Sequence, residues 1–153
     1  MNLELAIETL KHDLADVVAE IWPTGSRVYG KPREEWKGKR PPSDWDLITF
    51  VTDRFYEAIC ELHDSNWSFG GSFWEALWEN HGPIEDQDFV SMRNYQNINA
   101  IVIQCPHKFD SMMAARDYLT ERAPVDRDFS VKIHKQFYEE MRNGISHHGM
   151  PTL

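Results

Sequence analysis

Two aspartates, Asp44 and Asp46, stand one residue apart where a hydrophobic run begins in this 153-residue sequence. Side chains at positions i and i+2 of a β-strand share a face, so these carboxylates would lie roughly 6.6 Å apart. Their negative charges repel each other, and a hard divalent cation such as Mg²⁺ or Mn²⁺ relieves that repulsion because it prefers carboxylate oxygens. The pair therefore indicates a metal site suited to phosphoryl or nucleotidyl transfer.

Residues that can hold phosphate accompany this pair. Gly25 and Ser26 form a turn whose backbone amides and hydroxyl can donate hydrogen bonds to phosphate, and the Arg27 guanidinium can pair with it. Lys132 lies near the start of the last predicted helix, where a positive side chain opposes the helix dipole and favours a nearby anion. We therefore expect these residues to contact a nucleotide.

The net charge of −9 argues against non-specific binding of duplex DNA through positive charge spread over the whole surface. The positive charge is instead concentrated in one stretch, where five cations occur between Lys31 and Arg40.

The length and the cysteines favour a simple organisation. We expect one domain over residues 1–144 and a frayed tail over residues 145–153. Cys60 and Cys105 lack CxxC spacing, and no apolar run is long enough to cross a bilayer. The sequence thus predicts a reduced, cytoplasmic protein without a membrane partner, whereas its oligomeric state stays open.

Several elements must position the candidate site. Asp44 and Asp46 would share a face with Ile48 and Phe50, and Asn99 would share one with Ile101 and Ile103. The predicted elements are a helix from Leu3 that ends near Trp22-Pro23, a strand over 45–51, a hairpin of strands 89–95 and 98–104 joined at Gln96-Asn97, and helices over 54–62, 72–82, 109–121 and 127–142, the last capped by Gly144.

The stretch GSRVYG (residues 25–30) followed by SDWDL (residues 43–47) resembles the GS…SDxDL signature of the nucleotidyltransferase superfamily, which includes DNA polymerase beta and the minimal nucleotidyltransferases. The resemblance covers the first third of the chain closely, and the remainder is similar to small nucleotidyltransferase-like proteins of bacteriophages, which would place the protein in a host cytoplasm. It implies an α+β fold, with a mixed β-sheet and helices packed mainly on one face. It also implies Asp44 and Asp46 as catalytic metal ligands, Ser26 and Ser43 as nucleotide contacts, Mg²⁺ or Mn²⁺ as cofactor, and an NTP as substrate or ligand.

Two features depart from the family pattern. Sixteen residues separate Ser26 from Ser43, and the excess segment Lys31–Pro42 is either a substrate-gripping flap or a disordered surface loop. Active members generally carry a third carboxylate on the strand after the hairpin turn, at the position matched here by Asn99. An amide is a neutral ligand and a poor general base. Asp86 or Asp88 could approach the site instead.

These observations leave three functions open. The first is transfer of a nucleoside monophosphate from an NTP to a hydroxyl of a protein, an RNA or a small molecule, with Asp44, Asp46 and Asn99 as the catalytic set. The second is a catalytically inactive module on the same fold that binds a nucleotide or a host protein. In the third, the two aspartates only cap the turn after Pro42.

Overall fold

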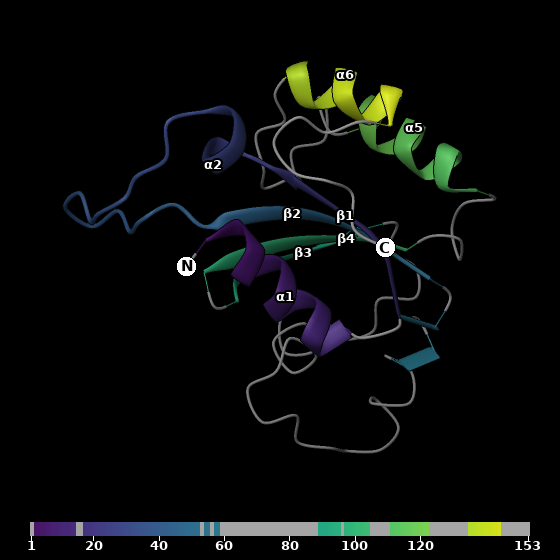
Figure 1. Ribbon diagram of the computed structural model, residues 1–153, viewed down its shortest axis with the longest axis horizontal. Helices are drawn as coiled ribbons and strands as arrows, with labels where there is room; N and C mark the ends of the chain where they lie inside the picture. Colours follow the sequence, from purple (N-terminus) through teal and green to yellow (C-terminus); the bar gives the residue numbers. More distant parts are fainter. Residues whose placement is uncertain are drawn as a thin grey trace.

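A computed structural model describes residues 2–14, 17–52, 54–55, 57–58, 89–95, 97–104, 111–122 and 135–144. Its elements are α1 (Leu3–Leu14), β1 (Val18–Thr24), α2 (Ser26–Tyr29), β2 (Trp45–Val51), β3 (Phe89–Tyr95), β4 (Ile98–Gln104), α5 (Met112–Arg122) and α6 (Lys135–Asn143) (Figure 1). The strands form one mixed sheet in the order β1-β2-β4-β3. Strands β2 and β4 are parallel, whereas β1 pairs with β2 and β3 with β4 in antiparallel fashion. The expected α+β class with a mixed sheet is confirmed.

Helices cover both faces of the sheet, which corrects the expectation that they pack mainly on one face. Helix α1 lies on one side of the sheet, and α5 and α6 lie on the other (Figure 1). The cause is visible in β2, where the consecutive residues Leu47 and Ile48 point to opposite faces and are both fully buried. A strand that is apolar on both faces requires a layer of cover on each side.

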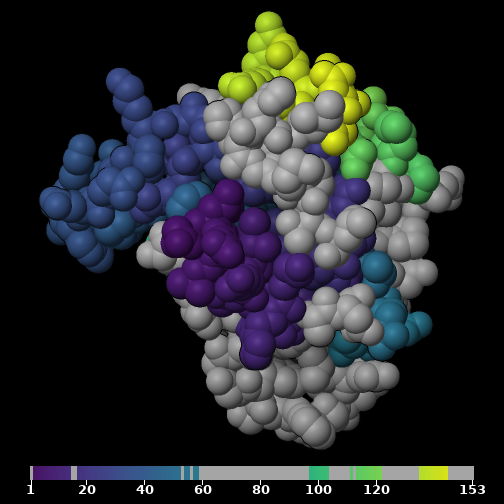
Figure 2. All heavy atoms as spheres, viewed as in Figure 1, coloured from purple at the N-terminus to yellow at the C-terminus, as the bar shows by residue number. Residues whose placement is uncertain are grey.

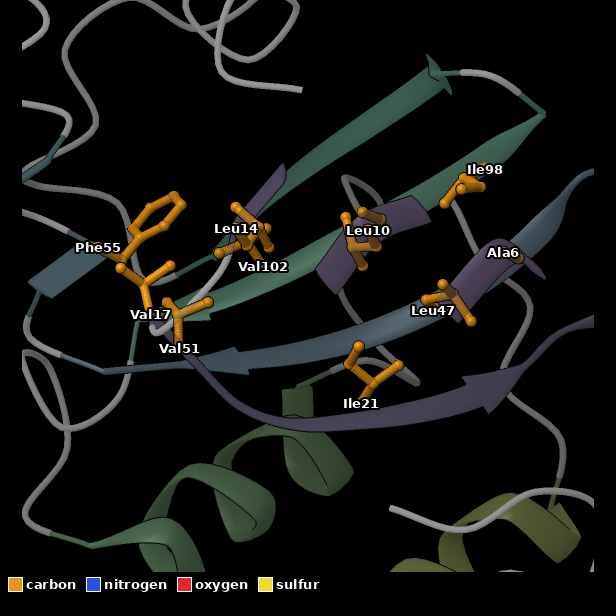
Figure 3. Close-up of a cluster of buried hydrophobic side chains, with 11 residues drawn as sticks. Ala6, Leu10, Leu14, Val17, Ile21, Leu47, Val51, Phe55, Ile98 and Val102 are labelled. Carbon is orange, nitrogen blue, oxygen red and sulfur yellow. The ribbon is translucent and has the colours of Figure 1, made fainter. Parts of the chain in front are cut away.

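Each face has its own apolar core. On the first face, Leu10 and Leu14 of α1 pack over residues that include Leu47 of β2 and Val102 of β4 (Figure 3). On the second face, Phe137 and other residues of α5 and α6 pack over the opposite side of the same strands. The second core comprises Trp22, Ile48, Phe50, Ile101, Ile103, Ala115, Leu119, Phe137 and Met141.

The first predicted helix is too long. Helix α1 ends at Leu14, and the chain from Val18 to Thr24 is strand β1, which pairs with β2. The apolar residues of this stretch fit both a helical and a strand period, and pairing with β2 decides between the two. Pro23 is tolerated because β1 lies at the edge of the sheet, where a strand needs ladder hydrogen bonds on one side only.

Other predicted elements are confirmed. Strand β2 and the hairpin β3–β4 have the expected bounds, and Asn97 in the hairpin turn adopts a positive φ of 65°. Helix α5 starts at Met112, later than expected. Ser111 precedes it as the N-cap, because its hydroxyl accepts a hydrogen bond from the Ala114 N–H at 3.1 Å. Gly144 follows α6 with a φ of 72°, as expected of a C-terminal cap.

Some predictions lie outside the described residues, namely the helix over 72–82, most of the helix over 54–62, the first part of the last helix, and the tail 145–153. Among the helices that the structure does describe, none has the length and apolar character needed to cross a membrane.

Candidate nucleotide and metal site

Three polar residues form a row across neighbouring strands at one end of the sheet. Asp46 of β2 is in register with Thr24 of β1 on one side and with Asn99 of β4 on the other. Facing residues in paired strands project from the same face. The row lies on the face covered by α5 and α6. Asp46 is two positions before Ile48 and Asn99 is two positions before Ile101, so each shares a face with a residue of that core.

Asn99 contacts Asp46 directly. The Asn99 amide Nδ2 donates a hydrogen bond to Asp46 Oδ1 at 2.9 Å, and Asn99 is 3% exposed. Asn99 therefore lies beside Asp46, whereas its predicted catalytic role stays a prediction. Its amide satisfies a carboxylate oxygen with a neutral donor, whereas an ionised third acid at this position would repel Asp46 unless a cation balanced the charge.

Gly25 brings the Gly-Ser turn against the Asp46 carboxylate. Its φ of 82° and ψ of −168° lie in a region that essentially only glycine occupies. A Cβ atom at this position would also lie 2.1 Å from Asp46 Oδ2 and 2.8 Å from Asp46 Cγ. Both the conformation and the close approach require glycine, and they place the predicted phosphate-binding turn beside the predicted metal ligand.

Two hydroxyl groups lie at this turn. Thr24 is fully buried, and its Oγ1 has no hydrogen-bond partner within the described part of the chain. Ser26, the first residue of α2, is half-buried, and its backbone carbonyl accepts the N–H of Gly30 at 3.0 Å. Sequence reasoning missed Thr24 because β1 was assigned to a helix; read as a strand, residues 20, 22 and 24 alternate onto one face.

Arg27 and Ser43, both expected to bind nucleotide, close the base of a loop in this structure. The Arg27 guanidinium donates through Nε and Nη2 to the Ser43 carbonyl at 3.0 and 2.8 Å, and through Nη1 to Glu34 Oε1 at 2.9 Å. It also lies over the Trp45 ring, 5.3 Å from the centroid. The Ser43 hydroxyl accepts the backbone N–H of Arg33 at 2.8 Å. In this structure both residues contact the loop, and their predicted roles in nucleotide binding stay predictions.

The loop so closed is the segment 31–42, which we call the basic loop. Lys37 and Arg40 exchange backbone hydrogen bonds at 2.9 and 3.0 Å around Gly38, whose φ is 63°. A glycine with positive φ at this place is typical of a two-residue hairpin turn. Arg33 Nε donates to the Pro41 carbonyl at 2.8 Å. The segment thus has a defined turn, and its predicted role as a substrate-gripping flap stays a prediction.

The remaining candidates are less closely placed. Asp44 is half-buried and directly precedes β2, two positions before Asp46. Lys132, Asp86 and Asp88 lie outside the described residues, so their predicted roles stay predictions. Within the described ranges, no group of three or more His, Cys, Asp or Glu residues gathers in the arrangement of a metal site.

The chemistry of these side chains is of the kind that divalent cations and phosphates prefer. Asp44 and Asp46 supply hard oxygen ligands, and the buried Thr24 hydroxyl and the glycine turn supply hydrogen-bonding groups beside them. Comparison of the chain with protein-family models, curated proteins and solved structures gave no match. The case for a function consequently depends on the motif residues and their geometry.

Proposed function

We propose that the protein is a weakly active nucleotidyltransferase, which transfers a nucleoside monophosphate from an NTP to a hydroxyl acceptor with Mg²⁺ or Mn²⁺ held by Asp44 and Asp46. The observation that carries this proposal is the close approach of Gly25 to the Asp46 carboxylate. A glycine turn and an acidic pair come from two separate elements and meet at one end of the sheet. A turn that only connected β1 to α2 would not need this close contact between Gly25 and Asp46.

Each residue has a role in this proposal. Gly25 leaves room for the Asp46 carboxylate to approach the turn, and the Ser26 and Thr24 hydroxyls donate hydrogen bonds to phosphate oxygens. Asn99 orients Asp46 through its amide, but it cannot take the proton from an attacking hydroxyl. A bound metal would neutralise the charge that develops on the transferred phosphate. The missing base is the reason we expect slow transfer.

A second candidate is an inactive module that binds a nucleotide or a host protein. The hydrogen bond from Asn99 Nδ2 to Asp46 Oδ1 favours it, because this bond satisfies an aspartate oxygen without any cation. Such a site can keep its shape without metal. The two candidates therefore differ in whether nucleotide binding depends on a divalent ion.

Transfer of label from each of the four α-labelled NTPs, with Mg²⁺ or Mn²⁺ and with host lysate or RNA as acceptor, tests the first candidate. We expect slow labelling by the natural chain, no labelling by Asp46→Asn, and labelling increased on the order of 10²–10⁴-fold by Asn99→Asp, which restores a general base. Asp117→Asn is the matched control, because Asp117 is exposed on α5 and does not belong to the row. It should label like the natural chain.

Calorimetry separates the second candidate from the first. We expect Mg²⁺ to strengthen NTP binding, and we expect Asp46→Asn to remove that strengthening. If neither the natural chain nor Asn99→Asp labels any acceptor, and nucleotide binds equally well with and without metal, the transferase proposal fails and the inactive module replaces it.

A further inference from the structure

The basic loop concentrates positive charge on an acidic protein. Its five cations and two acids give residues 31–42 a net charge of +3, so the other 141 residues together carry −12. The loop extends away from the body of the molecule between α2 and β2 (Figure 1), and it forms a separate projection in the space-filling view (Figure 2). A field of this sign on a projecting segment attracts polyanions, while the acidic body repels them.

The base of the loop is held by its own polar groups. Arg27 and Ser43 close it, and Glu34, one of its two acids, is paired with Arg27 at 2.9 Å. The turn at Gly38 is held by the two backbone hydrogen bonds between Lys37 and Arg40. A loop already formed loses less conformational entropy on binding than a loop that must order, so it binds more tightly for the same contacts.

The tip presents an aromatic ring next to cations. Trp36 is 67% exposed, an unusual exposure for the largest apolar side chain. Lys37, Lys39 and Arg40 beside it are exposed, and no described residue forms an ion pair with their side chains. A flat ring that can stack on a base, flanked by cations that can contact phosphates, is the combination with which proteins bind single-stranded nucleic acid.

We infer that the basic loop binds a single strand of nucleic acid, with Trp36 stacked on a base and Lys37, Lys39 and Arg40 on the flanking phosphates. Duplex DNA fits less well, because its bases are stacked within the helix and offer no free face to Trp36. An acidic protein segment would use the cations but would leave the indole ring without a planar partner. The exposed tryptophan therefore decides between these polyanions.

The loop also has a defined place relative to the candidate site. It follows α2, whose first residue, Ser26, belongs to the Gly-Ser turn, and it ends directly before Ser43 and Asp44. A strand bound to the loop can therefore direct a terminal hydroxyl toward the aspartates. This acceptor role rests on the proposed transferase function, whereas binding of the strand does not.

Fluorescence anisotropy of dye-labelled oligonucleotides of about 12 nucleotides, within the usual site sizes for single strands, measures the binding. The ligands are an RNA, a DNA of the same sequence, and the corresponding duplex. We expect both single strands to bind more tightly than the duplex; the two single-strand arms show whether the 2′-hydroxyl contributes. With three phosphates neutralised, raising salt from 50 to 200 mM should weaken binding by about 20-fold.

Two sets of variants divide the binding between charge and stacking. Lys37→Gln/Lys39→Gln/Arg40→Gln should abolish most of the salt dependence and should leave the turn intact, because the turn hydrogen bonds are made by the backbone. Trp36→Ala should weaken binding by about 5-fold or more, and Trp36→Phe should restore part of it.

The matched control for the triple variant removes two lysines and one arginine from helices α1 and α6 and leaves the loop unchanged. It is Lys11→Gln/Lys135→Gln/Arg142→Gln.

The inference fails if no single strand binds, if the control variant loses as much affinity as the loop variant, or if Trp36→Ala has no effect. It also fails if duplex binds as well as single strands, or if poly-glutamate competes as well as the oligonucleotides. Label transfer is measured separately. Absence of transfer in a chain whose loop still binds the strand would overturn the proposed function alone, and absence of binding in an active chain would overturn this inference alone.

Discussion

Glu20 and Asp46 are two carboxylates on the same side of one sheet, and their contacts differ in kind. Glu20 of β1 accepts hydrogen bonds from Arg116 Nη2 on α5, at 2.6 Å to each of its oxygens, and from Trp22 Nε1 at 2.8 Å. Asp46 of β2 accepts a hydrogen bond from Asn99 on the adjacent strand. The first contact joins a helix to the sheet; the second joins two strands that backbone hydrogen bonds already hold together.

This difference indicates which carboxylate serves the fold. The pair formed by Glu20 and Arg116 fixes α5 over β1, and Arg116 also lies 5.3 Å from the centroid of the Trp22 ring. The contact between Asp46 and Asn99 adds no new connection between layers. We therefore expect Glu20 to contribute much more than Asp46 to the free energy of unfolding.

The largest effect should come from Arg116→Ala. The side chains of Arg116 and Glu20 are 20% and 13% exposed, so truncating Arg116 leaves Glu20 charged and poorly solvated. Breaking such a pair costs about 3 kcal/mol. The urea-unfolding midpoint measures the loss, and Lys135→Ala, whose partner Glu139 is 4.0 Å away on an exposed face, is the control with an expected loss below about 0.5 kcal/mol. Equal losses of stability in Arg116→Ala and Lys135→Ala would show that the pair of Glu20 and Arg116 does not serve the fold.

Tyr29→Phe tests whether a neutral donor between layers also stabilises the fold. The Tyr29 hydroxyl of α2 donates to Glu140 of α6, which is 5% exposed and also accepts from Gln136 Nε2 at 3.1 Å. Hydrogen bonds to charged groups contribute about 2 kcal/mol, so we expect a loss of that size in urea unfolding.

Tyr138→Phe is the control for this change at neutral pH. The Tyr138 hydroxyl is buried without a partner in the described part of the chain, so its removal should be neutral or slightly stabilising. A loss in Tyr29→Phe no greater than in the control would show that the connection between α2 and α6 does not depend on this bond.

Tyr138 also predicts a pH dependence. Burial raises the pKa of Tyr138 to about 12, and nearby Arg142 acts in the opposite direction. The unfolded chain releases this proton near pH 10, whereas the folded chain retains it, so stability is complete below about pH 10 and is lost as pH rises to about 12. Because the side chain is partly exposed, we expect a loss of about 1 kcal/mol. Unfolding midpoints of the natural chain and Tyr138→Phe, measured from pH 9 to 12, should diverge, because only the natural chain loses this stability.

Asp46→Asn should have the smallest effect on stability. The change keeps the size of the side chain and an oxygen that can accept from Asn99, and β2 remains bonded to both neighbouring strands. We expect a change within about 0.5 kcal/mol in urea unfolding, comparable with that of the exposed control Asp117→Asn. A loss approaching that of Arg116→Ala would show that Asp46 serves the fold and would contradict the comparison.

Local pattern predicted the parts of this fold that local physics determines. Strand β2 and the hairpin β3–β4 are short runs with strand periodicity and clear turn residues at their ends. Periodicity did not identify β1, because Val18 and Ile21 fit both a helical and a strand period. Only the pairing with β2 shows that this stretch is a strand. The two-sided cover of the sheet was likewise missed, although consecutive apolar residues such as Leu47 and Ile48 in one strand are its signal in the sequence.

The residues of the candidate site were predictable from the sequence, whereas most of their contacts were not. Asp46 and Gly25 were identified together, and their contact follows from the structure. The contact with Asn99 depends on the parallel register of β2 and β4, which joins residues 53 positions apart. The contacts of Arg27 could not be foreseen, since its partners lie on a loop whose path no local pattern determines.

Because the basic loop is closed at its base, we expect the positions of the aspartates to be independent of the length of the loop. Arg27 and Ser43 hold the two ends of the segment together, so we expect residues added or exchanged near Gly38 to leave Asp44 and Asp46 in place. Doubling the length of a flexible loop costs only about 0.6 kcal/mol. The tip is thus the place where the chain can acquire a different recognition segment, by natural insertion or by grafting, while the candidate site stays intact.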